Sequence, residues 1–246
     1  MISPTRTAIR GLIARRDICI MAIITESFRK DRDMLKIWGR ATSSNVQALM
    51  WTVGELELEH ERYDVGFKFG GTDTPEFLAM NPNGLIPVVK DGDDGEALFE
   101  TGAICRYLAA RHAHDSFWPK DPAARAHVDK WAEWGKVTAA AAFTVPIFWA
   151  VVRTPAKDRN PEAIARALAA FDRLLGIAEA ELEKHAFLAG DSFTLADIMF
   201  GHILYRYHTM EIDRPARPAV EAYYAAMTER PAYRDHVMVS YDSLRP

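Results

Sequence analysis

The sequence predicts an α/β domain in the first half of the chain and an all-helical domain in the second half. Beyond residues 1–33, strand-type segments occur only between residues 35 and 99, as short apolar or β-branched runs bounded by turn residues. After residue 122 the strand signals stop, and apolar residues recur at the spacing of three and four that is typical of helices. Pro87 opens an apolar run, which fits the first position of a strand because proline cannot donate to a sheet ladder.

The predicted elements of the α/β domain follow the order β-α-β-(α)-β-β-α, which is that of a thioredoxin-like domain. The predicted strands cover residues 35–38, 62–65, 87–89 and 97–99. The predicted helices cover residues 46–58, 75–78 and 100–111. We expect this domain to span residues 34–113, with a linker over residues 114–124 and the helical domain over residues 125–246.

The stretch from Asn81 to Val89 combines a turn-rich entry with the strand that Pro87 opens. Ile86, the residue before this proline, is expected to be extended. Two geometries are open for the Ile86–Pro87 peptide bond. A trans bond would make this an ordinary loop-to-strand proline, whereas a cis bond would turn the N–H and C=O of Ile86 outward, free to pair with an extended peptide.

The helical domain is predicted from its helix-start signals and its apolar spacing. A long helical stretch over residues 123–152 contains Pro146, near which we expect a bend. Asn160-Pro161-Glu162 places a cap, a proline and an acidic residue in the order that starts a helix. Thr194-x-x-Asp197 is a variant of the capping box and predicts another helix start. Residues 220–229 form the predicted last helix, before Arg230-Pro231.

The composition is that of a globular protein and argues against several classes of function. The 246 residues are 49% hydrophobic and 26% charged, with a net charge of −4. The first 33 residues carry +3, so the remainder carries −7, which argues against binding to nucleic acid or to an anionic membrane. No uninterrupted apolar segment reaches the roughly 20 residues that a membrane-spanning helix needs.

Residues 1–33 form a leader with two possible origins. Four arginines precede its first acidic residue, which fits a transit-type presequence. A mis-assigned start codon would give the same pattern, because the first recognisable strand begins right after Met34. The two cysteines, Cys19 and Cys105, lie far apart and form no Cys-x-x-Cys motif, which predicts a reducing compartment without a disulfide framework.

Two spaced motifs carry a resemblance to a known family. Asn81-Pro82-Asn83-Gly84-x-Ile86-Pro87-Val88-Val89 is followed by an Asp-Gly turn and by Leu98-Phe99-Glu100-Thr101-Gly102-Ala103-Ile104. This pattern resembles the glutathione-binding, thioredoxin-like domain of the cytosolic glutathione transferases, and the loop after the first strand is similar to their serine-type, theta- or Nu-like members. The resemblance implies a cytoplasmic homodimer that uses glutathione as co-substrate, together with a small electrophile.

The loop Ser43-Ser44-Asn45 lies between the first strand and the first helix, where the resemblance implies the catalytic residues Ser43 and Asn45. Glutathione chemistry needs the thiolate, and a hydroxyl donor above a helix N-terminus would favour it. In the alternative interpretation these residues are only helix caps, a role that suits Ser44 best. The loop holds no tyrosine or cysteine, which argues against the tyrosine-type classes and against chemistry on a protein thiol.

The resemblance also implies how glutathione would be held. Ile86 and Pro87 would present the backbone that pairs with its cysteinyl unit. Glu100 would accept hydrogen bonds from its α-ammonium group, and Thr101 would donate to its α-carboxylate; alternatively, the pair only caps a helix. Leu85 stands where many relatives have a basic residue, so we expect Thr72 or Lys68 to contact the glycyl carboxylate.

A second-substrate pocket is expected along the long helix, with Trp149 and Arg153 in it and Trp131, Trp134 and Phe148 as further aromatic residues. The alternative is that the aromatic residues belong to the core. The eight histidines form no metal-binding pattern, so no metal is predicted. The implied function is glutathione transfer to an electrophile, with Nu-like disulfide reduction or a non-catalytic scaffold as alternatives.

Overall fold

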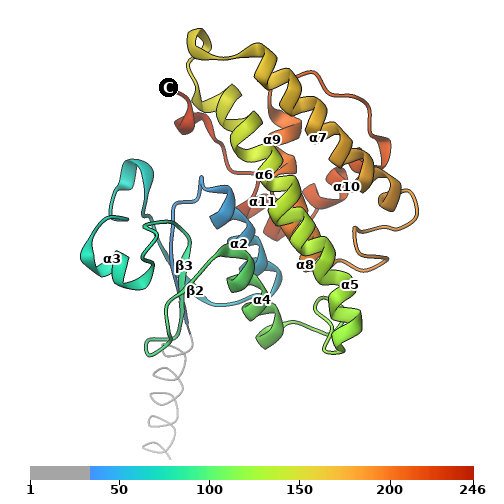
Figure 1. The fold of residues 1–246 in the computed structure, drawn as a ribbon. Helices are drawn as coiled ribbons and strands as arrows, with labels where there is room; N and C mark the ends of the chain where they lie inside the picture. The colour runs from blue at the N-terminus through green and yellow to red at the C-terminus, as the bar shows by residue number, and fades with distance from the viewer. Residues whose placement is uncertain (1–33) are drawn as a thin grey trace, which may run out of the picture.

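A computed structural model describes residues 34–246, so the predictions for residues 1–33 lie outside the described part (Figure 1). Its sheet has the order β2-β1-β3-β4. The strands are β1 (Leu35–Trp38), β2 (His60–Tyr63), β3 (Val88–Asp91) and β4 (Leu98–Phe99). β1 runs parallel to β2 and antiparallel to β3, which pairs antiparallel with β4. The predicted element order is therefore confirmed.

The helices of this domain are α2 (Ser44–Glu55), α3 (Pro75–Met80) and α4 (Thr101–His112), with a short 3-10 turn η1 (Phe67–Phe69) before α3. In Figure 1, α3 lies on one side of the sheet, and α2 and α4 lie on the side that faces the helical domain. Helix α2 ends three residues before the predicted position because Glu57 is left-handed, with φ of 52°. The second strand consequently starts two residues earlier than predicted.

A single long helical stretch, Pro122–Arg153, opens the helical domain (Figure 1). It consists of α5 (Pro122–Glu133), the π-helical segment η2 (Trp134–Ala139), α6 (Ala140–Phe143) and the π-helical segment η3 (Thr144–Arg153). Pro146 lies in η3, where the π-helical geometry accommodates the proline within the helix. Within residues 34–246 this is the one helix long and apolar enough to cross a membrane by length and composition. This long helix packs against α7 and α8. The core helix of a soluble protein can have the same length and apolar composition.

The predicted helix starts of this domain are confirmed. Helix α7 (Pro161–Leu182) begins after Asn160, whose side chain accepts a hydrogen bond from the N–H of Ala163 at 3.0 Å. Helix α8 (Leu195–Gly201) begins at the capping box, where the Thr194 N–H donates to the Asp197 carboxylate at 2.7 Å. The short turn η4 (Ala156–Asp158) connects the long helix to α7.

The prediction that the last helix ends before Arg230-Pro231 is wrong. After α9 (Leu204–Thr209) and α10 (Pro218–Thr228), the chain forms α11 (Pro231–His236) and a final turn η5 (Asp242–Leu244). Pro231 is the first residue of α11. Proline is tolerated there because the N–H groups of the first helical turn have no acceptor within the helix, so the N–H that proline lacks is not needed. Tyr233 of α11 packs edge-on against Trp51 of α2, with 4.7 Å between the ring centres, and this contact holds α2 against α11.

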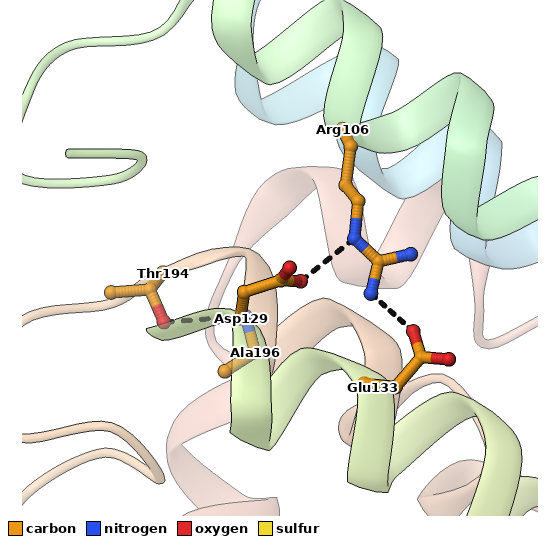
Figure 2. A network of polar contacts seen from close by, with 5 residues as sticks. All are labelled: Arg106, Asp129, Glu133, Thr194 and Ala196. Atoms are coloured by element: carbon orange, nitrogen blue, oxygen red, sulfur yellow. Dashed lines mark hydrogen bonds and ion pairs between the residues drawn. The ribbon is translucent and has the colours of Figure 1, made fainter. Parts of the chain in front are cut away.

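A polar contact between α4 and α5 also joins the two halves of the chain. Arg106 Nε donates to the Asp129 carboxylate at 2.7 Å, and an Nη atom of Arg106 donates to Glu133 (Figure 2). Both acids lie one turn apart on α5, so one guanidinium reaches both. Together with the α2–α11 contact, this ion pair sets the position of the first domain relative to the long helix.

Candidate functional site

A cavity of about 300 Å³ lies between the β1–α2 loop and the long helix. Its polar lining includes four cationic side chains and the predicted catalytic loop. Residues from α9 and from the C-terminal turn η5 complete it, and in Figure 1 the C-terminus lies beside the C-terminal end of the long helix. The lining residues are Arg40, Thr42, Ser43, Ser44, Asn45, Lys136, Ala140, Ala141, Thr144, Val145, Phe148, Trp149, Arg153, Arg206 and Leu244.

Ser43 occupies the N-cap position of α2, with extended backbone angles, yet its side chain makes no capping hydrogen bond. The hydroxyl therefore stays free to donate to a group in the cavity that it lines. The suggestion that Ser44 is the cap is wrong, because Ser44 is already the first residue of the helix and is buried. The N-terminus of α2 thus meets the cavity without a side chain that neutralises its positive end.

Asn45 is oriented by a lysine from the other domain. Lys136 Nζ in η2 donates to Asn45 Oδ1 at 2.7 Å. An ammonium group has donors only, so it must face the amide oxygen, and the Nδ2 donors of Asn45 are left for other partners. Burial lowers the pKa of Lys136 below its usual value of 10.5.

The Ile86–Pro87 peptide bond is cis. Neither the N–H nor the C=O of Ile86 hydrogen-bonds within residues 34–246, so both remain available. The preceding turn is held by the buried Asn81, whose Nδ2 donates to the Leu85 carbonyl at 2.7 Å. A methyl group placed on Gly39, at the end of β1, would lie 3.5 Å from Ile86 Cβ, so this backbone lies beside the start of the predicted catalytic loop.

Glu100 precedes α4 with a left-handed φ of 68°, and its side chain does not cap the helix. Residues held in such sparsely populated conformations cluster at ligand-binding sites. Thr101, the first residue of α4, is buried. The geometry of Glu100 and Thr101 is therefore not that of a simple helix cap.

The other predicted glutathione contacts are spread along the α/β domain. Thr72 lies beside the β2–α3 loop, where its Cγ2 would be 3.5 Å from a methyl group placed on Gly66. Lys68 is exposed and lies over the Phe69 ring at 5.3 Å. The cavity therefore brings together Ser43, Asn45, Trp149 and Arg153, whereas Ile86, Pro87, Glu100, Thr101 and Thr72 do not line it.

The aromatic residues of the long helix divide between core and cavity. Trp131 packs edge-on against Trp134 at 5.4 Å, and Trp134 packs against Phe200 of α8 at 5.5 Å. Neither tryptophan lines the cavity, and both are partly buried against the core. Phe148 belongs to the core and also lines the cavity, which Trp149 lines as well.

The sequence did not predict three cationic residues that line the cavity, namely Arg40, Lys136 and Arg206. Arg40 lies two residues after the end of the predicted strand, in the loop before Ser43, which was the only local signal. Lys136 and Arg206 lie on helices far along the chain, and nothing in their neighbours marks them. Only the packing of the helical domain onto α2 brings them to the site.

Two further observations bear on the chemistry of the site. Cys105 is fully buried, and burial raises the pKa of its thiol to about 12, so the thiolate is strongly disfavoured. Within residues 34–246, no group of three His, Cys, Asp or Glu side chains is arranged to hold a metal ion.

Two protein-family models match the chain: the glutathione S-transferase N-terminal domain over residues 34–110 and the C-terminal domain over residues 161–226. Glutathione S-transferase GstB of Escherichia coli K12 is 37% identical over 206 residues, which are 84% of this chain and 99% of the relative. Glutathione S-transferase 3 of Zea mays is 33% identical, over 82% of this chain and 93% of that protein.

A solved structure shows the same architecture. The theta class glutathione S-transferase from Xanthomonas axonopodis pv. citri with glutathione bound superposes with a TM-score of 0.79 at 41% identity. The match covers 85% of this chain and 99% of that one. The fold of this chain agrees with these comparisons: it has a thioredoxin-like domain with an uncapped serine at the start of α2, and a helical domain across the cavity. The relatives also match over nearly their full length. The chain belongs to the glutathione S-transferase family.

Proposed function

We propose that this protein is a glutathione transferase that activates the glutathione thiol and transfers it to a small electrophile. The observation that carries the proposal is the free hydroxyl of Ser43 at the N-terminus of α2, in the wall of the cavity. The two family models, the full-length relative GstB and the glutathione-bound Xanthomonas enzyme support it.

The thiol of free glutathione is mostly protonated at neutral pH, since a cysteine thiol has a pKa of about 8.5. Three groups favour the thiolate here: the hydroxyl of Ser43, the Nδ2 donors of Asn45 and the positive end of α2. Lys136 orients the amide of Asn45 and adds a partly buried positive charge nearby. The thiolate sulfur then forms a bond to the electrophilic carbon, whose leaving group departs with the bonding electron pair.

The α/β domain supplies the groups that would orient the tripeptide. The unpaired backbone of Ile86 before Pro87 would hydrogen-bond the cysteinyl unit as a strand does. Glu100 would accept from the α-ammonium group, and Thr101 at the N-terminus of α4 would donate to the α-carboxylate. Thr72 is our candidate for the glycyl carboxylate, because Leu85 has no polar group. Trp149 and Arg153 would contact the electrophile.

Isothermal titration with glutathione tests the proposal, and absence of binding would leave only a scaffold role. A panel of haloaryl electrophiles and of mixed disulfides then separates conjugation from glutathione-dependent disulfide reduction, which would use the same thiolate. A homodimer and a cytoplasmic location remain predictions from the family, and sedimentation of the purified chain checks the former.

A further inference from the structure

The cavity has an unbalanced charge. Four of its lining residues are cationic, namely Arg40, Lys136, Arg153 and Arg206, and the lining contains no aspartate or glutamate. None of the three arginines forms an ion pair within residues 34–246, whereas other arginines of the chain do so repeatedly. Clustered like charges repel, so a pocket built in this way gains when an anion enters it.

Arg206 gives the strongest indication that the cavity binds an anion. The residue is 3% exposed, and its Nη2 donates only to neutral oxygens, the Thr42 carbonyl at 2.8 Å and Gln47 Oε1 at 3.1 Å. Its Nε is buried and has no hydrogen-bond partner. A buried charge is costly unless it is paired, so an unpaired guanidinium beside a cavity indicates a ligand. Burial and the neighbouring cations lower the pKa of Arg206 to about 9.

Arg40 and Arg153 converge on the same volume from the two domains. Their Cζ atoms lie 5.4 Å and 5.2 Å from the centre of the Phe67 ring, so this one aromatic side chain contacts both guanidinium groups. Arg40 Nε is also buried without a partner. Burial, and after it the charge of Arg153, lowers the pKa of Arg40 below its usual value of 12.5.

Apart from Lys136, Thr144 and Arg153, the lining that the long helix contributes is apolar and partly aromatic. Phe148 lies under the guanidinium of Arg206, with 4.4 Å between Cζ and the ring centre, and Trp149 lies 4.3 Å from Cζ of Arg153. Ala140, Ala141 and Val145 continue this wall. A cavity of about 300 Å³ with such walls fits an aromatic ring together with one small charged group.

We infer that the second substrate is an aromatic electrophile that carries an anionic group, held by Arg40, Arg153 and Arg206 while its reactive carbon faces Ser43. The inference rests on the proposed glutathione transferase function and specifies its substrate class. The competing assignment is that these arginines hold a carboxylate of glutathione itself. It is disfavoured because the groups expected to bind those carboxylates, Thr101 and Thr72, do not line this cavity.

The test compares two benzyl chlorides of nearly the same shape, the anionic 4-(chloromethyl)benzoate and the neutral 4-(chloromethyl)benzamide. In both, the glutathione thiolate forms the S–C bond, chloride leaves with the electron pair of the C–Cl bond, and the thiol proton goes to solvent. After subtraction of the uncatalysed rate, we expect kcat/KM to favour the benzoate by about tenfold or more, as one charge-assisted hydrogen bond would give. Arg153→Gln and Arg206→Gln should each reduce this ratio about tenfold.

The matched control is Arg166→Gln, which removes one positive charge from an exposed position on α7 and should leave the ratio unchanged. Titration calorimetry with the two S-benzyl glutathione products gives the same comparison without turnover, and Arg153→Gln covers the case in which the buried Arg206 variant does not fold. Equal kcat/KM and equal affinity for the charged and neutral compounds would overturn the inference while leaving the transferase intact. A rise in the glutathione KM alone would reassign the arginines to glutathione, and no binding of glutathione would instead refute the proposed function.

Discussion

We expect that removing the hydroxyl of Ser43 reduces catalysis while leaving folding almost unchanged. The side chain makes no capping hydrogen bond, so Ser43→Ala leaves no orphaned partner and should change the free energy of unfolding by less than about 0.5 kcal/mol. A hydrogen bond to a charged acceptor contributes roughly 1.5–3 kcal/mol. Since about 1.4 kcal/mol corresponds to one pKa unit, the pKa of bound glutathione should rise by about one to two units.

The assay is the ultraviolet absorbance of the thiolate in the binary complex, titrated with pH, together with the pH profile of kcat/KM. At pH 6.5, turnover should fall about 10- to 100-fold while the glutathione affinity changes little. Ser44→Ala is the matched control, because this neighbouring serine lies inside the first turn of α2. An unchanged thiol pKa in Ser43→Ala, or an equal loss in Ser44→Ala, would refute the role given to Ser43.

Three further predictions follow from other contacts. Lys136→Met removes the 2.7 Å bond to Asn45 and should lower kcat about tenfold, with the loss abolished when Asn45 is already alanine in a double-mutant cycle. Asp197→Ala leaves two buried N–H donors unpaired, removes the carboxylate acceptor of a tyrosine hydroxyl, and should lower the free energy of unfolding by about 3 kcal/mol in urea titrations; a loss below about 1 kcal/mol would contradict the capping-box interpretation. Burial lowers the pKa of His202 to about 3, so the unfolded state binds more protons below its ordinary value of 6.5. Stability should therefore fall as pH drops from 6.5, by about 3 kcal/mol at pH 4.5, and His202→Phe should flatten this dependence, whereas an unchanged slope would contradict it.

Local signals were enough for most of the fold. The proline at Pro87, the cap at Asn160 and the box at Thr194 each act through their own neighbours in the chain, so their effects are visible in the sequence. The errors lie where tertiary contacts decide. α11 is only a short segment after Arg230-Pro231, and its packing of Tyr233 on Trp51 of α2 joins residues far apart in sequence.

The same division holds for the candidate site. The sequence determined the architecture, the family and the loop that carries Ser43 and Asn45, because these depend on short-range patterns and spaced motifs. Only the tertiary structure showed that Ser43 leaves its hydroxyl free, that Lys136 orients Asn45, and that Arg206 is buried without a counter-ion. Those facts depend on how the helical domain packs on α2, and the charge of a pocket is a sum over residues that only folding brings together.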